Sequence, residues 1–173
     1  MGSNILGRFI FSCAAGLIVM AGTASAVELR GGTEKDYAAL SDLAETWMQT
    51  YASGDVETLM PYYDSHTHMM PEGLRKFRGP DEIRPYFKES IGAVDLVVVN
   101  NLEEIEVNGT WAYLIGVFAA KVTPKDGGES GFVGGRYMIL LRKDPDGVWR
   151  VLRDMDNSTT DTAPLIARLK GAD

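Results

Sequence analysis

The sequence predicts an α+β fold in which three N-terminal helices pack against a strongly bent, mostly antiparallel sheet that forms a cone-shaped barrel. Up to Ile91, apolar residues recur at steps of three and four, which is the spacing of amphipathic helices. From Val94 onward, long apolar-rich runs are separated by short turn motifs, which is typical of antiparallel strands. With 173 residues, 45% of them hydrophobic, the chain can form one globular domain with a buried core.

The first 26 residues differ in composition from the rest of the chain. Arg8 is their only charged residue, an apolar run follows it, and Ala24-Ser25-Ala26 has the small residues of a cleavage site. These features predict a secretory signal peptide at 1–26 rather than a membrane anchor, because the apolar run is shorter than the roughly 20 residues that a span needs. We therefore expect a periplasmic or secreted protein without membrane contact after cleavage.

Cleavage after Ala26 would also remove Cys13, the only cysteine, so the mature chain could form no disulfide within itself. Loss of Arg8 would change the net charge from −7 to −8. A chain this acidic, without a basic stripe, is a poor candidate for binding nucleic acid or anionic membranes. The remaining chain divides into an N-terminal extension at 27–35, a domain at 36–160 and a tail at 161–173.

Three helices are predicted before the sheet. Thr33 and Asp36 form a capping-box pattern at the start of the first helix, and Gly54 supplies its end. A second, short helix is expected at 55–63 and a third from Asp81, because an aspartate at each start can act as N-cap. The apolar faces contain Tyr37, Leu40, Leu43, Trp47, Met48 and Tyr51 in the first helix, and Ile83, Phe87 and Ile91 in the third.

The strands are predicted from alternation and from turn chemistry. A short strand at 65–70 would place His66, His68 and Met70 together on one face. Asn-Gly is a strong hairpin signal, Asp-Pro-Asp-Gly joins a second hairpin, and two adjacent asparagines at 100–101 indicate a bulge. The expected long strands are 95–107, 110–123, Gly131–Lys143 and 148–157, and a last short helix is expected at 164–170.

Four stretches carry a family resemblance when taken together and in order. They are WMQTYASGDVETLMPYYDSHTHMMPEG, RGPDEIRPYF, VNGTWAYLIG and DGVWRVLRDMDN, within 36–157. The chain resembles the nuclear transport factor 2-like (cystatin-like) superfamily, particularly its SnoaL-like branch of small proteins, many of unknown function. This resemblance implies the same cone-shaped fold, and a homodimer through the sheet face, where Trp111 and Tyr113 would suit an interface.

The fold does not determine the activity, because the superfamily includes ketosteroid isomerase, scytalone dehydratase, polyketide cyclases and limonene epoxide hydrolase. By resemblance, Trp47 occupies the position of the ketosteroid isomerase tyrosine that donates to the oxyanion. Met70 occupies the position of its aspartate base. An indole N–H is a weaker donor and a thioether cannot accept a proton, so the resemblance argues against a ketosteroid isomerase.

A set of aromatic or soft apolar side chains is expected to line the cone. As separate residues they are ordinary core, but as a set they suit a small apolar or aromatic ligand. The proposed ligand-binding residues are Trp47, Tyr51, Tyr63, Met70, Phe87 and Arg136.

Asp154 is the main candidate for catalysis, with His68 as the second. Arg136 and Asp154 lie on the two strands of the last hairpin and could form a surface ion pair; alternatively Asp154 points into the cone, where burial would raise its pKa. His66 and His68 have the spacing of two metal ligands, but a third ligand would have to come from another strand. We therefore predict no metal site and no cofactor.

Three hypotheses follow for the function. The first is a ligand-binding domain without strong catalysis, against which a cavity smaller than about 300 Å³ would count heavily. The second is an isomerase, dehydratase or cyclase-type enzyme that uses Asp154 or His68 for proton transfer, which requires one of these side chains to reach the cavity. The third is a dimeric interaction scaffold.

Overall fold

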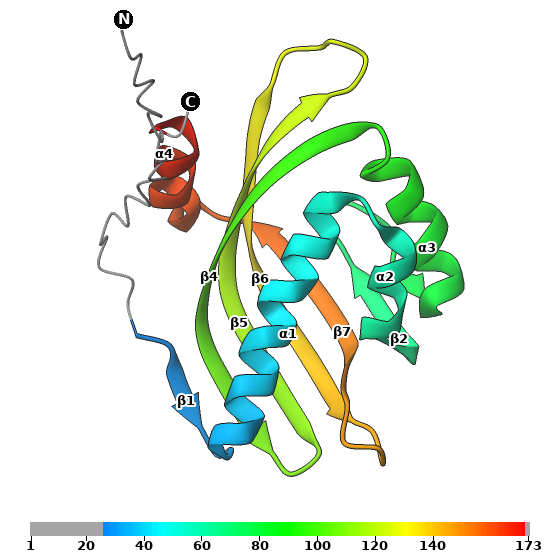
Figure 1. Cartoon of the computed structure of the whole chain (residues 1–173), viewed down its shortest axis with the longest axis vertical. Helices are drawn as coiled ribbons and strands as arrows, with labels where there is room; N and C mark the ends of the chain where they lie inside the picture. Colours follow the sequence, from blue (N-terminus) through cyan, green and yellow to red (C-terminus); the bar gives the residue numbers. More distant parts are fainter. Residues whose placement is uncertain (1–25, 172–173) are drawn as a thin grey trace, which may run out of the picture.

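The computed structural model describes residues 26–171, and its fold is the predicted α+β arrangement of helices against a curled sheet (Figure 1). The predicted signal peptide, apart from Ala26, lies outside the described residues. The sheet has seven strands in the order β1-β4-β5-β6-β7-β2-β3, and it curls without closing into a barrel. The strands are β1 Glu28–Arg30, β2 Tyr63–Met70, β3 Phe77–Arg78, β4 Val94–Asn108, β5 Trp111–Pro124, β6 Gly131–Lys143 and β7 Trp149–Ser158.

The four long strands β4 to β7 form the predicted antiparallel meander. The sheet is nevertheless mixed, because β1 pairs with β4 and β2 pairs with β7 in parallel. Neither β1 nor β3 was predicted from the sequence, since runs of three and two residues are too short to show alternation. They lie at the two edges of the sheet, where pairing on one side suffices.

The helices begin and end close to the predicted positions. Thr33 accepts a hydrogen bond from the backbone N–H of Asp36 at 3.2 Å, and Gly54 ends α1 with a φ of 75°, which glycine adopts without strain. The third helix starts at Gly79, two residues before the predicted cap Asp81. None of the described helices is long and apolar enough to span a membrane. The helices are α1 Glu34–Ser53, α2 Val56–Leu59, η1 Met60–Tyr62, α3 Gly79–Ser90, η2 Thr160–Thr162 and α4 Ala163–Gly171.

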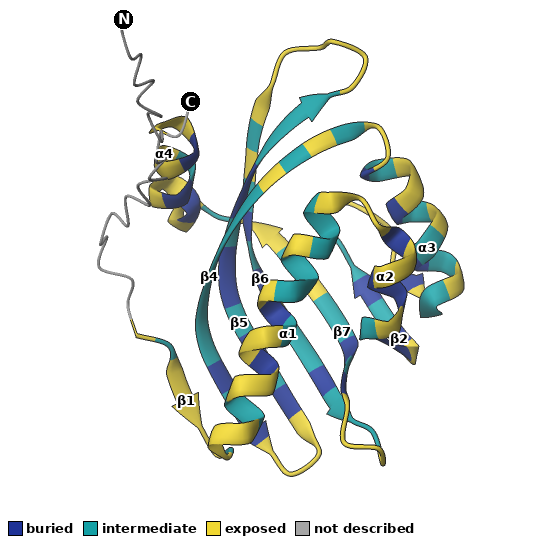
Figure 2. Ribbon diagram, viewed as in Figure 1, coloured by how far each residue is buried: buried dark blue, intermediate teal, exposed yellow. Residues whose placement is uncertain are grey.

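The main core lies between the inner face of the sheet and the three N-terminal helices (Figure 2). Leu40 of α1 and Ile83 of α3 are fully buried there, and so are Leu114 and Leu141 of the sheet. Leu40 and Ile83 lie on the apolar helix faces that the sequence pattern predicts. Burial of this face fixes α1 and α3 over the concave side, which encloses the space described below.

A β-bulge bends the longest strand. Leu102 pairs with Gly116 and Glu104 pairs with Ile115, so Glu103 is an extra residue with no partner on β5. The bulge was expected at the two asparagines 100–101, and it lies further along the strand. It reverses the alternation, because even-numbered residues face the helices before it and Ile105 faces them after it.

The C-terminal helix α4 packs on the opposite, outer face of the sheet. Its residues Leu165 and Leu169 are buried against Val117 and Ala119 of β5 and form a second, smaller core. Figure 1 shows α4 on the side of the sheet away from α1. Within the tail predicted at 161–173, residues 163–171 therefore cover part of the sheet.

Candidate functional site

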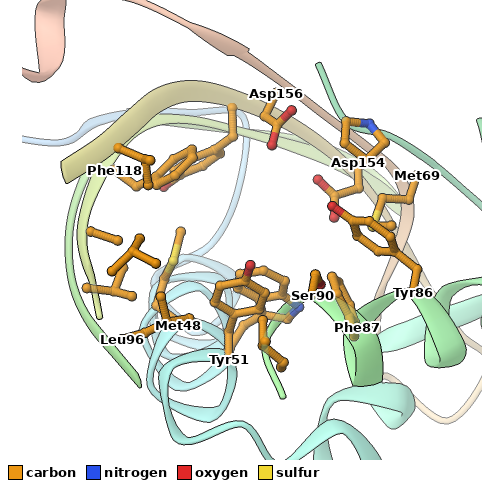
Figure 3. A pocket seen from close by; sticks show the side chains of 18 of the residues that line it. Met48, Tyr51, Met69, Tyr86, Phe87, Ser90, Leu96, Phe118, Asp154 and Asp156 are labelled. Atoms are coloured by element: carbon orange, nitrogen blue, oxygen red, sulfur yellow. The ribbon is translucent and has the colours of Figure 1, made fainter. Parts of the chain in front are cut away.

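A cavity of about 230 Å³ lies between α1, α3 and the inner face of the sheet (Figure 3). Its lining combines aromatic side chains from the helices, aliphatic side chains from β4 and β5, and two carboxylates from β7. Asp154 and Asp156 share this face because they lie two residues apart on a strand, as the alternation predicts.

The helices contribute a connected group of aromatic rings. Trp47 and Tyr51 of α1 are stacked, with ring centroids 5.1 Å apart. The Phe87 ring of α3 meets the Tyr51 ring edge-on at 5.6 Å, and Tyr86 lies 5.6 Å from Phe87. Such packing holds the rings in fixed orientations, so this wall of the cavity is preorganised.

Asp154 of β7 lines the same cavity as these rings. It is partly buried, and its Oδ2 accepts a hydrogen bond of 3.2 Å from the Tyr63 hydroxyl of β2. Burial raises the pKa of Asp154 from its ordinary 3.8 to about 6; the charge of Asp156 adds to the rise, and the Tyr63 bond opposes it. Asp154 is therefore largely ionised at neutral pH but remains basic enough to accept a proton.

Asp156 is held in place by the turn that follows β2. The backbone N–H of Glu72 donates to Asp156 Oδ1 at 2.8 Å. Glu72 in turn accepts hydrogen bonds from the backbone N–H and the hydroxyl of Ser158. This reciprocal contact fixes the end of β7 beside the cavity.

The tyrosines around Asp154 keep their protons at neutral pH. Burial raises the pKa of Tyr51 to about 12 and the pKa of Tyr63 well above its ordinary 10. Burial also raises the pKa of Tyr86. Their hydroxyl groups can therefore donate hydrogen bonds in the cavity but do not act as bases there.

The floor of the cavity is formed by Tyr137 of β6. Its hydroxyl donates to Asn100 Oδ1 at 3.1 Å, and its ring crosses the backbone of β5 at Gly116. A Cβ atom at Gly116 would overlap the Tyr137 hydroxyl and would lie 2.7 Å from the Asn101 carbonyl oxygen. Glycine at 116 is thus required for this close approach.

Two polar atoms of residues that line the cavity form no hydrogen bond of regular geometry within the described part of the chain. They are Nε1 of Trp47 and Oγ of Ser90, and both atoms are buried. Trp47 nevertheless lies within reach of the Tyr63 hydroxyl and Ser90 within reach of the Tyr86 hydroxyl, since each contact lowers the pKa of that tyrosine. Neither atom is open to the cavity, so both belong to the packing behind its wall.

Of the predicted ligand-binding residues, Trp47, Tyr51 and Phe87 line the cavity, and Tyr63 contacts it through its bond to Asp154. Met70 does not: it pairs with the exposed Met155 on the outer face, and Met69 lines the cavity instead. The alternation of β2 is as predicted, but alternation alone does not say which of the two sets faces inward.

Neither histidine reaches the cavity. His68 pairs with Arg153 and Arg78 on the outer face, and its pKa is lowered by partial burial and then by the charges of Arg153, Lys76 and Arg78. The side chain of His66 is 81% exposed. Among residues 26–171, no three His, Cys, Asp or Glu side chains are grouped as metal ligands.

Arg136 is also absent from the cavity wall. It was expected to lie opposite Asp154, but it pairs with Asn157, and Asp154 pairs with Ile139. The Arg136 guanidinium forms an ion pair with Asp161 beside η2. A register offset of three residues in the hairpin therefore separates the two groups that the sequence had suggested as partners.

The sequence interpretation missed several cavity residues, namely Met69, Tyr86, Ser90, Phe118 and Tyr137. Tyr86 and Ser90 are four residues apart and follow the same side of α3, a spacing that could have placed them beside Phe87. Phe118 and Tyr137 lie on inward-facing positions of strands, but the bulge obscures this orientation.

A second groove of about 500 Å³ lies between α1 and β4. It is lined by Ser41, Glu45, Gln49 and two asparagines among other residues, and it contains neither the aromatic group nor Asp154. The smaller cavity therefore remains the candidate site. At about 230 Å³ it is below the volume of about 300 Å³ at the low end for ligand sites, which counts against a simple binding domain.

No protein-family model matches the sequence, and no curated protein is similar to it. Solved structures do match. A ketosteroid isomerase-like protein from Erwinia carotovora atroseptica has a TM-score of 0.68 at 18% identity, covering 74% of this chain and 99% of its own. A nuclear transport factor 2-like superfamily protein from Salmonella enterica has a TM-score of 0.67 at 15% identity, covering 75% and 94%.

A hexachlorocyclohexane dehydrochlorinase from Novosphingobium barchaimii has a TM-score of 0.64 at 18% identity, covering 72% of this chain and 87% of its own. These likenesses confirm the predicted α+β fold, which the chain shares with solved structures that include a nuclear transport factor 2-like protein.

Proposed function

We propose that the protein is an enzyme that moves a proton on a small, largely apolar substrate held in the cavity, with Asp154 as the proton-transfer group. The observation that carries this proposal is the position of Asp154, whose carboxyl lines an aromatic cavity and has a pKa of about 6. A carboxyl with a pKa near neutrality can both take and return a proton at physiological pH.

The groups around Asp154 suit this role. The Tyr63 hydroxyl donates to Oδ2 of Asp154, which orients the carboxylate. The hydroxyls of Tyr51 and Tyr86 line the cavity and keep their protons, and they could donate to an oxygen on which negative charge develops. A base and donors on the wall of one cavity are the components needed for proton abstraction next to a carbonyl group.

The volume of the cavity limits its substrate to a compact molecule. The fold supports the same direction, since a matching structure is described as a dehydrochlorinase and another as ketosteroid isomerase-like. His68 has no part in this proton transfer, because it lies on the outer face of the sheet.

Exchange of substrate hydrogen with solvent would test the proposal without knowledge of the net reaction. Cyclohexanone and N-methyl-4-piperidone would be incubated with the protein in deuterated water, and incorporation of deuterium next to the carbonyl followed by NMR. We expect the rate of deuterium exchange to exceed the rate in buffer alone and to increase as the pH rises through about 6. In Asp154→Asn this rate should be about 100-fold lower.

Asp42→Asn is the matched control, because Asp42 is exposed on α1 and lines no part of the cavity. It removes the same charge and should leave the exchange rate unchanged. Exchange that is equally fast in Asp154→Asn would contradict the role of Asp154.

A second proposal concerns the outer face of the sheet. Trp111, Met138 and Met155 are exposed there, by 43%, 49% and 49%, and Met138 pairs with Met155 across neighbouring strands. Such an apolar surface supports a homodimer through this face, beside the area that α4 covers. Light scattering at micromolar concentration should give twice the chain mass, and Met138→Glu should give the single chain. A monomeric wild type would refute the dimer.

A further inference from the structure

The charge of the cavity wall is entirely negative. Asp154 and Asp156 are its carboxylates, and none of the described residues that line it is Lys, Arg or His. Both carboxylates belong to one strand and face the same space. A wall of this composition attracts a positive charge and repels an anion.

Three of the arginines on β6 and β7 form contacts away from the cavity. Arg136 forms its ion pair with Asp161, and Arg142 forms one of 2.5 Å with the buried Asp64 of β2. Arg153 donates to the carbonyl oxygens of His66 and Leu152. These contacts hold the three guanidinium groups away from the cavity, so they do not neutralise its carboxylates.

Aromatic rings lie on the cavity wall near the two carboxylates. Trp47, Tyr51 and Tyr86 lie on the wall near the carboxylates, and the faces of such rings attract cations. Figure 3 shows Asp154 and Asp156 directed into the cavity, with Tyr86 beside Asp154, Tyr51 facing them from α1 and Leu96 at the other end. The cavity therefore has one acidic and aromatic end and one aliphatic end.

We propose that the ligand of this cavity is a compact organic cation, an amine or a quaternary ammonium compound with an apolar substituent. The positive group would lie against Asp156 and the aromatic rings, and the apolar part would lie against Leu96 and its aliphatic neighbours. This inference rests on the proposed function, in which the same cavity holds the substrate.

The two carboxylates would have different roles in this proposal. Asp156 is fixed by the Glu72 N–H through Oδ1 and serves as counter-ion. Asp154 is fixed by Tyr63 and remains the proton-transfer group. An anionic molecule of the same size would meet two negative charges without a compensating cation from the wall.

Three soluble test ligands of nearly equal shape would distinguish the effect of ligand charge on binding from the effect of ligand size. Choline carries a trimethylammonium group, 3,3-dimethylbutan-1-ol has carbon in place of the nitrogen, and 3,3-dimethylbutanoate carries a carboxylate. Their dissociation constants would be measured by NMR chemical-shift titration of the protein at about pH 8, where Asp154 is ionised. We expect choline to bind about tenfold more tightly than the alcohol, and the carboxylate to bind most weakly.

Two further measurements assign this preference to the cavity. Asp156→Asn should reduce the ratio of choline to alcohol affinity, whereas Asp42→Asn removes the same charge from the surface and should not. At about pH 5 the ratio should also fall, because Asp154 is then protonated. The titratable groups that face Asp154 are Asp156 on β7 and the hydroxyls of Tyr63, Tyr51 and Tyr86, and these hydroxyls stay protonated over this range.

The possible outcomes are distinct. Equal binding of choline and the alcohol, or tighter binding of the carboxylate, overturns the cation preference but leaves the cavity as a ligand site. Binding of none of the three molecules overturns the inference and counts against the cavity as a site. If the ratio of choline to alcohol affinity in Asp156→Asn equals that of the wild type, at pH 8 and also at pH 5, the cation binds elsewhere. That result overturns the assignment to these carboxylates.

Discussion

The substitution Asp154→Asn should make the stability of the protein less dependent on pH. Folding raises the pKa of Asp154 from 3.8 to about 6, so the folded state binds this proton more tightly than the unfolded state. The wild type therefore loses stability as the pH rises from about 4 to about 6, and it loses no more from this group above that range.

The expected size follows from the shift itself. A rise from 3.8 to about 6 corresponds to about 3 kcal/mol at about 1.4 kcal/mol per pKa unit. Asparagine has nearly the shape of the protonated acid and can still accept the hydrogen bond of Tyr63. We expect the two proteins to be similarly stable near pH 4, and the variant to be more stable by about 2 to 3 kcal/mol near pH 7.5.

Urea unfolding at the two pH values would measure this difference, with tryptophan fluorescence as the signal. Other titrating groups cancel when the variant is compared with the wild type, and Asp42→Asn controls for the loss of one negative charge. If the difference between Asp154→Asn and the wild type is the same at both pH values, Asp154 does not occupy the desolvated site beside Asp156, and the reasoning fails.

Two other substitutions test the surroundings of the site. Gly116→Ala should destabilise the protein by about 1 to 3 kcal/mol in urea unfolding, because the added Cβ would displace Tyr137. Gly109→Ala is a control for glycine replacement without a clash. No atom lies within 4 Å of its added Cβ, so its cost comes only from the strained φ of 64°. Equal costs at both positions would contradict the steric reason.

Lys143→Met should raise the pKa of Asp36 from about 2 toward 3.8, as followed by NMR titration of the carboxyl carbon, because the Lys143 bond is the main cause of the low value. Since a lowered carboxyl pKa stabilises the fold above 3.8, the wild type loses this stabilisation as the pH falls from 3.8 to about 2, and the variant should lose less. An unchanged Asp36 pKa would refute the contact.

Much of the site could be predicted from local periodicity. Helical spacing placed Trp47, Tyr51 and Phe87 on inward faces, and alternation placed Asp154 beside Asp156. These predictions hold because each depends only on the geometry within one element. The fold class was predicted for the same reason, since each long element carries its own pattern and turn signals.

The errors concern relations between elements. The choice between Met69 and Met70 depends on which face of β2 meets the helices, and the partner of Arg136 depends on the register of β6 and β7. Neither is encoded in a single run of residues. The packing of α4 on the outer face was likewise missed, because a short amphipathic helix does not indicate which surface it will cover.

The bulge at Glu103 makes the size of the cavity depend on the number of residues in β4. Removal of this one residue would make Leu102 and Glu104 neighbours and restore regular alternation, so the inward side chains on both sides of it would still face inward. The strand would straighten, however, and the curvature over the cavity would relax. Single-residue insertions and deletions at this point would thus resize the cavity while every residue that lines it is retained, a route open to natural variation and to protein engineering.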